Sequence, residues 1–143
     1  MSVVVHMGTD VHLEDCLEIR RDVFVNEQGV DAQLEFDGLD HTCFHCLLSE
    51  WGKPVATARV RFLGSVAKIE RMAVLKDSRR KGYGGMILSR IIDLLNGMPE
   101  VVSVKLHAQK YAAPFYARHG FRVHGEPFVE ADIEHVLMHR RIP

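Results

Sequence analysis

The sequence lacks the features that would place the chain in a membrane or outside the cell. No apolar run approaches the roughly 18 residues that a membrane-spanning helix needs. The first ten residues, MSVVVHMGTD, carry no cationic segment of the kind that opens a signal peptide. There are only three cysteines, an odd number with no sign of a disulfide framework. We therefore expect a protein of the reducing cytoplasm.

The sequence also has little net charge and no internal repetition. The formal net charge is −1, so we expect neither nucleic acid nor an anionic membrane as a partner, and any anion site must be local. No repeat, low-complexity tract or Pro/Gly/Ser linker divides the 143 residues, which suffice for one domain with one core. The composition, 47% apolar and 26% charged, is that of an ordinary soluble domain.

Strand-like and helix-like segments alternate along the chain, which predicts an α/β domain with a mixed sheet. The expected strands are residues 2–7, 43–51, 55–63, 68–75, 101–108, 121–123 and 135–140. The expected helices are residues 11–28, 84–96 and 112–119, the first capped by Asp10. Gly52-Lys53-Pro54 is expected to turn a hairpin. In the strand 101–108, period-two alternation places four apolar residues on one face: Val102, Val104, Leu106 and Ala108.

A glycine-rich stretch, RRKGYGG at residues 79–85, lies between a strand-like run and a helix-like run. A helix N-terminus offers free backbone N–H groups and a partial positive charge, and glycine lets these amides approach an anion closely. The stretch fits neither the nucleotide-triphosphate loop nor the dinucleotide-binding motif. It therefore predicts a phosphate cradle, the alternative being a glycine-rich turn with solvated cations.

Two motifs give the chain a family resemblance. The pattern Arg79-x-x-Gly82-x-Gly84 resembles the R/Q-x-x-G-x-G/A signature of the GCN5-related N-acetyltransferases (GNAT). QKYAAPFYARHGF resembles that family's N-x-x-A-x-x-F-Y-x-x-x-G-F motif, with Gln109 where asparagine is usual. The segments EIRRDVFVNEQGV, EFDGLD and HGEPFVEADIEHVLMHR resemble a small bacterial subgroup, the YjcF/ElaA-like acyltransferases.

The resemblance implies one GNAT domain over residues 1–143. Its sheet would be mostly antiparallel, with one splayed parallel strand pair, and flanked by helices. Acetyl-CoA is the implied co-substrate, with its diphosphate on the glycine-rich turn and its pantetheine arm along the central strand. The implied cofactor-binding residues are Met72, Ala73, Val74, Arg79, Arg80, Lys81, Gly82, Tyr83, Gly84, Gly85, Gln109 and Phe115.

Tyr116 and Glu70 are the candidate catalytic residues. Tyr116 matches the family's thiol-protonating tyrosine, although an aromatic on a short helix can also serve packing alone. Glu70 is the candidate general base, because alternation along a strand would place it on the same face as Met72. The alternative is a salt bridge from Glu70 to Arg71 or to a neighbouring strand.

The fold implied by the resemblance places the acceptor between the first helix with its following loop and the late strands. Glu27, Gln28 and Asp37 are the candidate substrate-binding residues, alongside Asn26, Glu35 and Asp40. Clustered carboxylates would favour a cationic acceptor, whereas a solvated acidic loop is the plainer interpretation. No metal site is expected, because in HTCFHC the side chains of His41, Cys43 and His45 would face one way and that of Cys46 the other.

The function predicted on these grounds is transfer of an acetyl group to a primary amine of a small molecule or peptide. Two alternatives stay open. One is a domain that binds acyl-CoA without turning it over. The other is an acyl-homoserine-lactone synthase, because the segment RRDVFVNEQG of this chain resembles the N-terminal part of those enzymes. A homodimer is possible, since dimers are common in the family.

Overall fold

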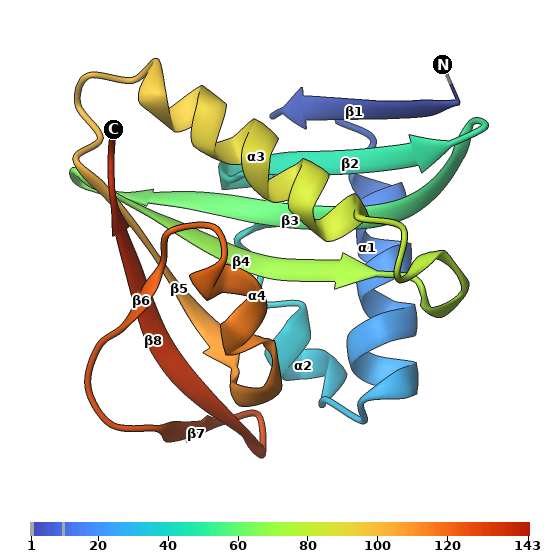
Figure 1. Cartoon of the computed structure of the whole chain (residues 1–143). Coiled ribbons are helices and arrows are strands. Elements are labelled where there is room, and N and C mark those ends of the chain that lie inside the picture. Colours follow the sequence, from blue (N-terminus) through green and yellow to red (C-terminus); the bar gives the residue numbers. More distant parts are fainter. Residues whose placement is uncertain (1, 10) are drawn as a thin grey trace.

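A twisted mixed sheet forms the centre of the computed structural model, which describes residues 2–9 and 11–143 (Figure 1). Within those residues the sheet has eight strands, in the order β1-β2-β3-β4-β5-β8-β6, with β7 paired to β8. The strands are β1 (Val3–Gly8), β2 (Phe44–Glu50), β3 (Lys53–Leu63), β4 (Val66–Val74), β5 (Ser103–Gln109), β6 (Arg122–Val123), β7 (Phe128–Glu130) and β8 (Ile133–Arg141). The paired strands are antiparallel except β4 and β5, which run parallel. The predicted fold class is confirmed.

Helices cover both faces of the sheet, with α3 in front and α1 behind in Figure 1. The helices are α1 (Leu13–Arg20), α2 (Ala32–Glu35), α3 (Tyr83–Asn96) and α4 (Ala113–Ala117). A π-helical segment, η1 (Arg21–Glu27), continues α1, and three 3₁₀ turns are η2 (Asp40–Thr42), η3 (Lys76–Ser78) and η4 (Lys110–Ala112). Helix α3 buries one apolar stripe, Ile87, Leu88, Ile91, Ile92 and Leu95, against the main core. None of the helices in the described residues is long and apolar enough to cross a membrane.

Most predicted strands and helices differ from the observed ones by one or two residues at their ends. The hairpin prediction was wrong in detail: the turn is Trp51-Gly52, both with positive φ, and Lys53 and Pro54 already belong to β3. Val102 was also misplaced, because β5 begins only at Ser103, and Val102 is 53% exposed whereas Val101 is buried. Two short elements, α2 and β7, were not predicted, and the proposed cap at Asp10 lies outside the described residues.

The parallel strands β4 and β5 separate halfway along their length. They pair from Val66 with Ser103 to Ile69 with Leu106, and no further. The last five residues of β4, 70–74, therefore pair with β3 alone, and their β5-facing edge has no strand partner. This separation opens the sheet at the carboxyl ends of the two strands.

A β-bulge interrupts β4 at the point of separation. Glu70 pairs with Arg59 and Ala73 with Thr57, so Arg71 and Met72 together stand opposite Ala58 alone. Arg71 takes a positive φ of 56°. The bulge reverses the alternation of side chains: Ile69 and Met72 both pack on the α3 side, and Ala73 packs on the α1 side.

This reversal overturns one prediction. Glu70 does not share a face with Met72, because the β-bulge at Arg71 and Met72 interrupts the regular alternation of side chains. The Glu70 side chain lies instead on the α1 face, where it meets arginines of β3.

Candidate active site

A cleft of about 840 Å³ occupies the gap between β4 and β5 and extends to both faces of the sheet. Twelve of the predicted site residues line it: Gln28, Glu35, Asp37, Glu70, Met72, Ala73, Val74, Arg79, Gly84, Gln109, Phe115 and Tyr116. Eight others lie outside its lining: Asn26, Glu27, Asp40, Arg80, Lys81, Gly82, Tyr83 and Gly85. The structure thus brings together residues from η1, β4, β5, α3 and α4, which are far apart in the sequence.

The glycine-rich turn presents unused backbone donors beside this cleft. Gly82 is the N-cap of α3 with φ of 80°, a left-handed conformation that glycine adopts without strain. The first backbone hydrogen bond of the helix runs from Met86 N–H to the Gly82 carbonyl, so the helix does not use the amides of Tyr83, Gly84 and Gly85. A Cβ on Gly84 would lie only 3.3 Å from the Phe115 ring. The turn therefore fits a diphosphate that needs close contact with backbone amides.

A valine at position 84 is expected to weaken acetyl-CoA binding about 10- to 100-fold. The branched side chain would press on Phe115 and block the approach to the amides. Losing one hydrogen bond to a charged group costs about 1.5–3 kcal/mol, which corresponds to that range in Kd. Titration calorimetry checks this, with Gly97→Ala at the other end of α3 as the folded control. An unchanged Kd in a folded Gly84→Val protein would contradict the assignment.

Two cations of the turn, Arg79 and Lys81, have acidic partners. Both guanidinium Nη atoms of Arg79 donate to the Glu27 carboxylate at 2.6 Å, and Arg79 Nε donates to the Val74 carbonyl at 2.9 Å. The hydrogen bond from Arg79 lowers the pKa of Glu27. Lys81 and the Tyr83 hydroxyl both reach Glu50. Arg79 thus ties the turn to η1, and Glu27 could contact an acceptor only if that pair opened.

Tyr116 lies on α4 with its ring wedged between Phe115 and Phe121, at centroid distances of 5.0 and 6.0 Å. The residue is 8% exposed and lines the cleft. Burial raises the pKa of Tyr116. The side chain therefore presents a protonated phenol to the cleft, as a proton donor must.

Three acidic side chains on the α1 side of the cleft, Glu35, Asp37 and Glu70, belong to a buried ionic network that the sequence analysis missed. Its centre is formed by Arg20 and Arg59, which are 1% and 0% exposed. Arg20 donates to Glu35 at 2.8 Å and to Asp40 at 2.6 Å. Arg59 donates to three carboxylates, those of Glu70 (2.7 Å), Asp37 (2.9 Å) and Asp40 (3.1 Å).

Two half-buried arginines complete the network. Arg61 contacts Glu70, and Arg71 contacts Glu35, Asp37 and Glu70 within 3.3 Å. Four guanidinium groups and four carboxylates thus balance in charge: Arg20, Arg59, Arg61 and Arg71 with Glu35, Asp37, Asp40 and Glu70. Burial opposes ionisation of Glu70, but the hydrogen bond and charge of Arg59 outweigh it, and the pKa of Glu70 lies below its ordinary value. The structure therefore favours the salt-bridge alternative for Glu70.

Glu70→Gln is accordingly expected to act on stability rather than on the pH dependence of catalysis. The glutamine would weaken charged hydrogen bonds to three arginines, which are worth about 1.5–3 kcal/mol each. Urea unfolding should show a lower free energy of unfolding, and the shape of the pH–rate profile should be unchanged. If the profile lost its ionisation limb while stability stayed at the wild-type level, Glu70 would be the base after all.

The remaining predicted residues lie at the cleft mouth and near the sheet edge. Gln109 Nε2 donates to Gln28 Oε1 at 2.8 Å, a bond that bridges β5 and the end of η1. In the HTCFHC segment, His45 Nε2 lies 2.6 Å from the Asp40 carbonyl, and the three cysteines of the chain are free and buried. Among residues 2–9 and 11–143, no group of three or more His, Cys, Asp or Glu side chains could hold a metal ion.

Comparison with known proteins identifies the family. A family model described as an acetyltransferase (GNAT) domain matches residues 14–142, so the chain belongs to the GNAT acetyltransferase family. The uncharacterized protein YyaT of Bacillus subtilis is 39% identical over 137 residues, covering 94% of this chain and 92% of YyaT. The uncharacterized N-acetyltransferase YjcF of B. subtilis is 37% identical over 127 residues, 88% of this chain and 90% of YjcF.

The solved structures agree with this assignment. The crystal structure of ElaA from Escherichia coli superimposes with a TM-score of 0.87 at 26% identity, covering 96% of this chain and 99% of ElaA. The predicted GNAT fold and the YjcF/ElaA-like subgroup are confirmed. Acyl transfer is thereby the supported class of activity.

Proposed function

We propose that this protein transfers an acetyl group from acetyl-CoA to a primary amine of a small molecule or peptide. The observation that carries the proposal is the cleft between β4 and β5. It joins the unpaired edge of β4, the glycine-rich N-terminus of α3 and the buried phenol of Tyr116 in one space. These are the three groups that binding and cleaving a CoA thioester require.

The chain's own residues suit each part of the co-substrate. The free amides at 83–85 would hold the diphosphate, and the open edge of Met72–Val74 would hydrogen-bond the amides of the pantetheine arm, like an added strand. Gly84 leaves room for this approach beside Phe115. Bound acetyl-CoA supplies an activated acyl group, whose carbon an amine attacks while the thiolate leaves.

Tyr116 would supply the proton that the departing sulfur needs. Burial raises its pKa and keeps the phenol protonated at neutral pH. The acceptor would enter from the α1 side, between η1, α2 and the β7–β8 hairpin, which all contribute to the cleft lining. The carboxylate of Asp37 already pairs with Arg59 and Arg71, so the predicted preference for a cationic acceptor loses its main support.

Two measurements test the proposal together. Titration calorimetry measures acetyl-CoA binding, and release of free thiol measures turnover with a panel of amines. The panel contains phenethylamine, spermidine, glucosamine 6-phosphate, and peptides with a free α-amine or a lysine. Binding together with amine-dependent thiol release is the expected result. Binding without thiol release from any of these amines would instead indicate a domain that only binds acyl-CoA.

A further inference from the structure

Two imidazoles and a carboxylate meet on the acceptor side of the cleft. Nδ1 of His107 lies 2.9 Å from Oε1 of Glu130, and Nε2 of His135 lies 3.9 Å from Oε2 of the same carboxylate. All three residues line the cleft. None of them belongs to the two GNAT motifs, although Glu130 and His135 lie in HGEPFVEADIEHVLMHR, the segment that resembles the YjcF/ElaA-like subgroup.

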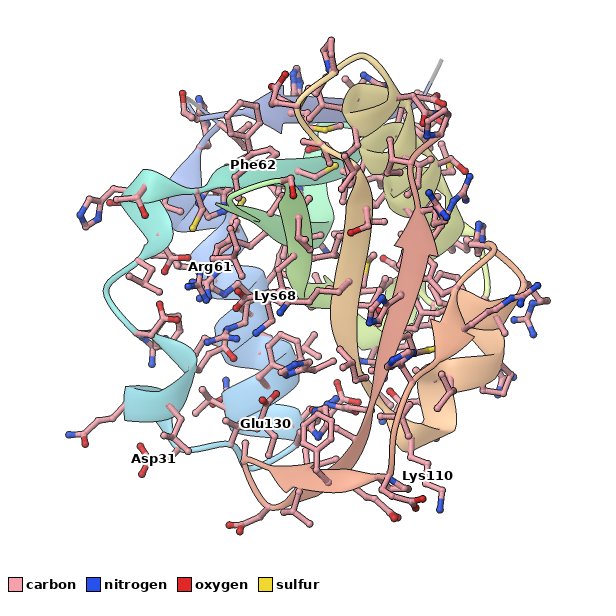
Figure 2. All side chains as sticks on the ribbon, turned by 90° about the vertical axis from the view of Figure 1, so that its left-hand side faces the viewer. Asp31, Arg61, Phe62, Lys68, Lys110 and Glu130 are labelled. Carbon is pink, nitrogen blue, oxygen red and sulfur yellow. The ribbon has the colours of Figure 1, made fainter. Side chains whose placement is uncertain are left out.

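The topology places His107 where the acyl group would be attacked. It follows Leu106, the last residue of β5 that pairs with β4, so it stands where the strands begin to separate. Leu106 and Ala108 are buried in the core on the α3 side, so alternation turns His107 to the opposite, acceptor side. Figure 2 shows Glu130 and Lys68 projecting on the side of the molecule that faces the viewer.

Aromatic packing holds the imidazole of His107 in place. The Phe128 ring meets His107 edge to face at 5.0 Å and stacks on His135 at 5.9 Å. His107 keeps 26% of its side-chain surface exposed. The ring is therefore fixed by its neighbours while one edge stays open to the cleft.

The hydrogen bond to Glu130 decides which nitrogen of His107 is available. A carboxylate only accepts, so the Nδ1–H of His107 donates to Glu130. In the neutral ring this leaves the lone pair on Nε2 free. The same reasoning applies to His135, whose Nδ1 lies 2.6 Å from the carbonyl of Ile133. A neutral imidazole oriented by a carboxylate is the arrangement that general bases use.

The other carboxylates of the cleft are each held by at least two arginines: Glu70, Asp37 and Glu35 all belong to the ionic network. Glu130, by contrast, contacts imidazoles. We infer that His107 is the general base of the acyl transfer and that Glu130 is the residue that positions it. This inference rests on the proposed function and identifies a residue for its proton-transfer step.

In the proposed acyl transfer, the carbon–sulfur bond breaks as the bond from the amine nitrogen to the acyl carbon forms. The nitrogen loses one proton to Nε2 of His107, and the sulfur gains one from Oη of Tyr116. Solvent then removes the proton from His107 and restores the one on Tyr116, so the products are an amide and free CoA.

The base hypothesis predicts a pH dependence with a definite sign. His107 acts when unprotonated, so kcat/KM should rise with pH through one ionisation and then level. Glu130 on β7 contacts the ring, and the other charged or titratable side chains that line the cleft on this side are Lys68, Glu70 and Arg71 on β4, Glu35 on α2, Asp37 in the loop after α2 and His135 on β8. Lys105 precedes His107 by two residues on β5 and pairs with Lys68. Glu130→Gln removes the carboxylate that fixes the tautomer of His107, so kcat/KM should fall, but by less than on loss of the base itself.

The test compares wild type with His107→Gln and Glu130→Gln, using the amine of the panel that is acetylated fastest. His107→Gln should lower kcat/KM by about 10²–10⁴-fold, the usual contribution of a general base, and remove the rising limb. Its acetyl-CoA affinity should match wild type. Glu130→Gln should lower the rate less. His124→Gln is the matched control, since that exposed histidine lies outside the cleft.

Imidazole ¹⁵N NMR gives a readout that needs no turnover. The wild-type spectrum should show His107 protonated at Nδ1 and free at Nε2, and Glu130→Ala should mix the two tautomers. An Nε2–H tautomer in wild type, or a His107→Gln enzyme with the wild-type rate and profile, overturns the inference and leaves the proposed function intact. If wild type acetylates none of the amines, the proposed function fails and the inference falls with it.

Discussion

Tyr116→Phe is expected to lower kcat by about 10²–10⁴-fold, the usual contribution of one general acid. The phenylalanine ring keeps the contacts with Phe115 and Phe121. The free energy of unfolding and the acetyl-CoA affinity should therefore change little. Because burial raises the pKa of Tyr116, the wild-type rate should show no alkaline loss from this group below the ordinary tyrosine pKa.

Steady-state thiol release measures the Tyr116 effect, and Tyr111→Phe serves as its control. Tyr111 is 78% exposed on the neighbouring turn, so loss of its hydroxyl should leave kcat near the wild-type value. An undiminished kcat in Tyr116→Phe would mean that a water molecule, rather than the phenol, protonates the sulfur.

Arg59→Met is expected to lower the free energy of unfolding by about 3–5 kcal/mol, the usual cost of removing one partner from a buried ion pair. Methionine fills much of the space but leaves Glu70, Asp37 and Asp40 short of their shared cation. Arg61→Met is the matched control on the same strand. It also contacts Glu70, but its side chain is 30% exposed, so solvent screens this pair more and its loss should cost less than the loss of Arg59. Urea unfolding at neutral pH that gave equal losses for both variants would contradict this account of the network.

Acidification should destabilise the wild type through the same carboxylates. Hydrogen bonds and charge from Arg59 hold the pKa values of Asp37, Asp40 and Glu70 below their ordinary values. At Asp40, Arg20 acts in the same direction. Their stabilisation is complete above the unfolded-state values near 4 and is lost as pH falls through the lower folded-state values. Glu35 opposes this, because burial raises its pKa. Since three groups outweigh one, stability should fall below about pH 4, and less steeply in Arg59→Met.

The parts of the site that could be predicted from the sequence are those set by local chemistry. Gly82 takes a left-handed conformation and is the N-cap of α3. Tyr116 lies in the same short motif as Phe115 and Phe121, on which its ring packs. The alternation of apolar residues gave the fold class, which the sheet topology confirms. At these positions the residues that make up the sequence pattern are also the residues whose contacts and backbone conformations form the local structure.

The parts that could not be predicted depend on pairing across the chain. Arg20 meets Glu35 and Asp40 only because α1 packs on β3, and His107 meets Glu130 only because β7 pairs with β8. The strand β7 has three residues, too few for a period to be recognised. The bulge in β4 was hidden for another reason: its left-handed residue is Arg71, and an arginine gives no signal of positive φ.

That bulge makes the chain length of β4 a determinant of function, independent of side-chain chemistry. The course of the strand after the bulge depends on the presence of one extra position. Deleting a single residue there would leave every candidate catalytic group in the sequence. Met72 would then pair with Ala58 and Ala73 would still pair with Thr57, so these side chains would keep their faces, but the local bend and extra twist of the bulge would be lost. In comparing or recombining related chains, a one-residue deletion between Glu70 and Ala73 is therefore expected to change the course of β4 at the point where it separates from β5.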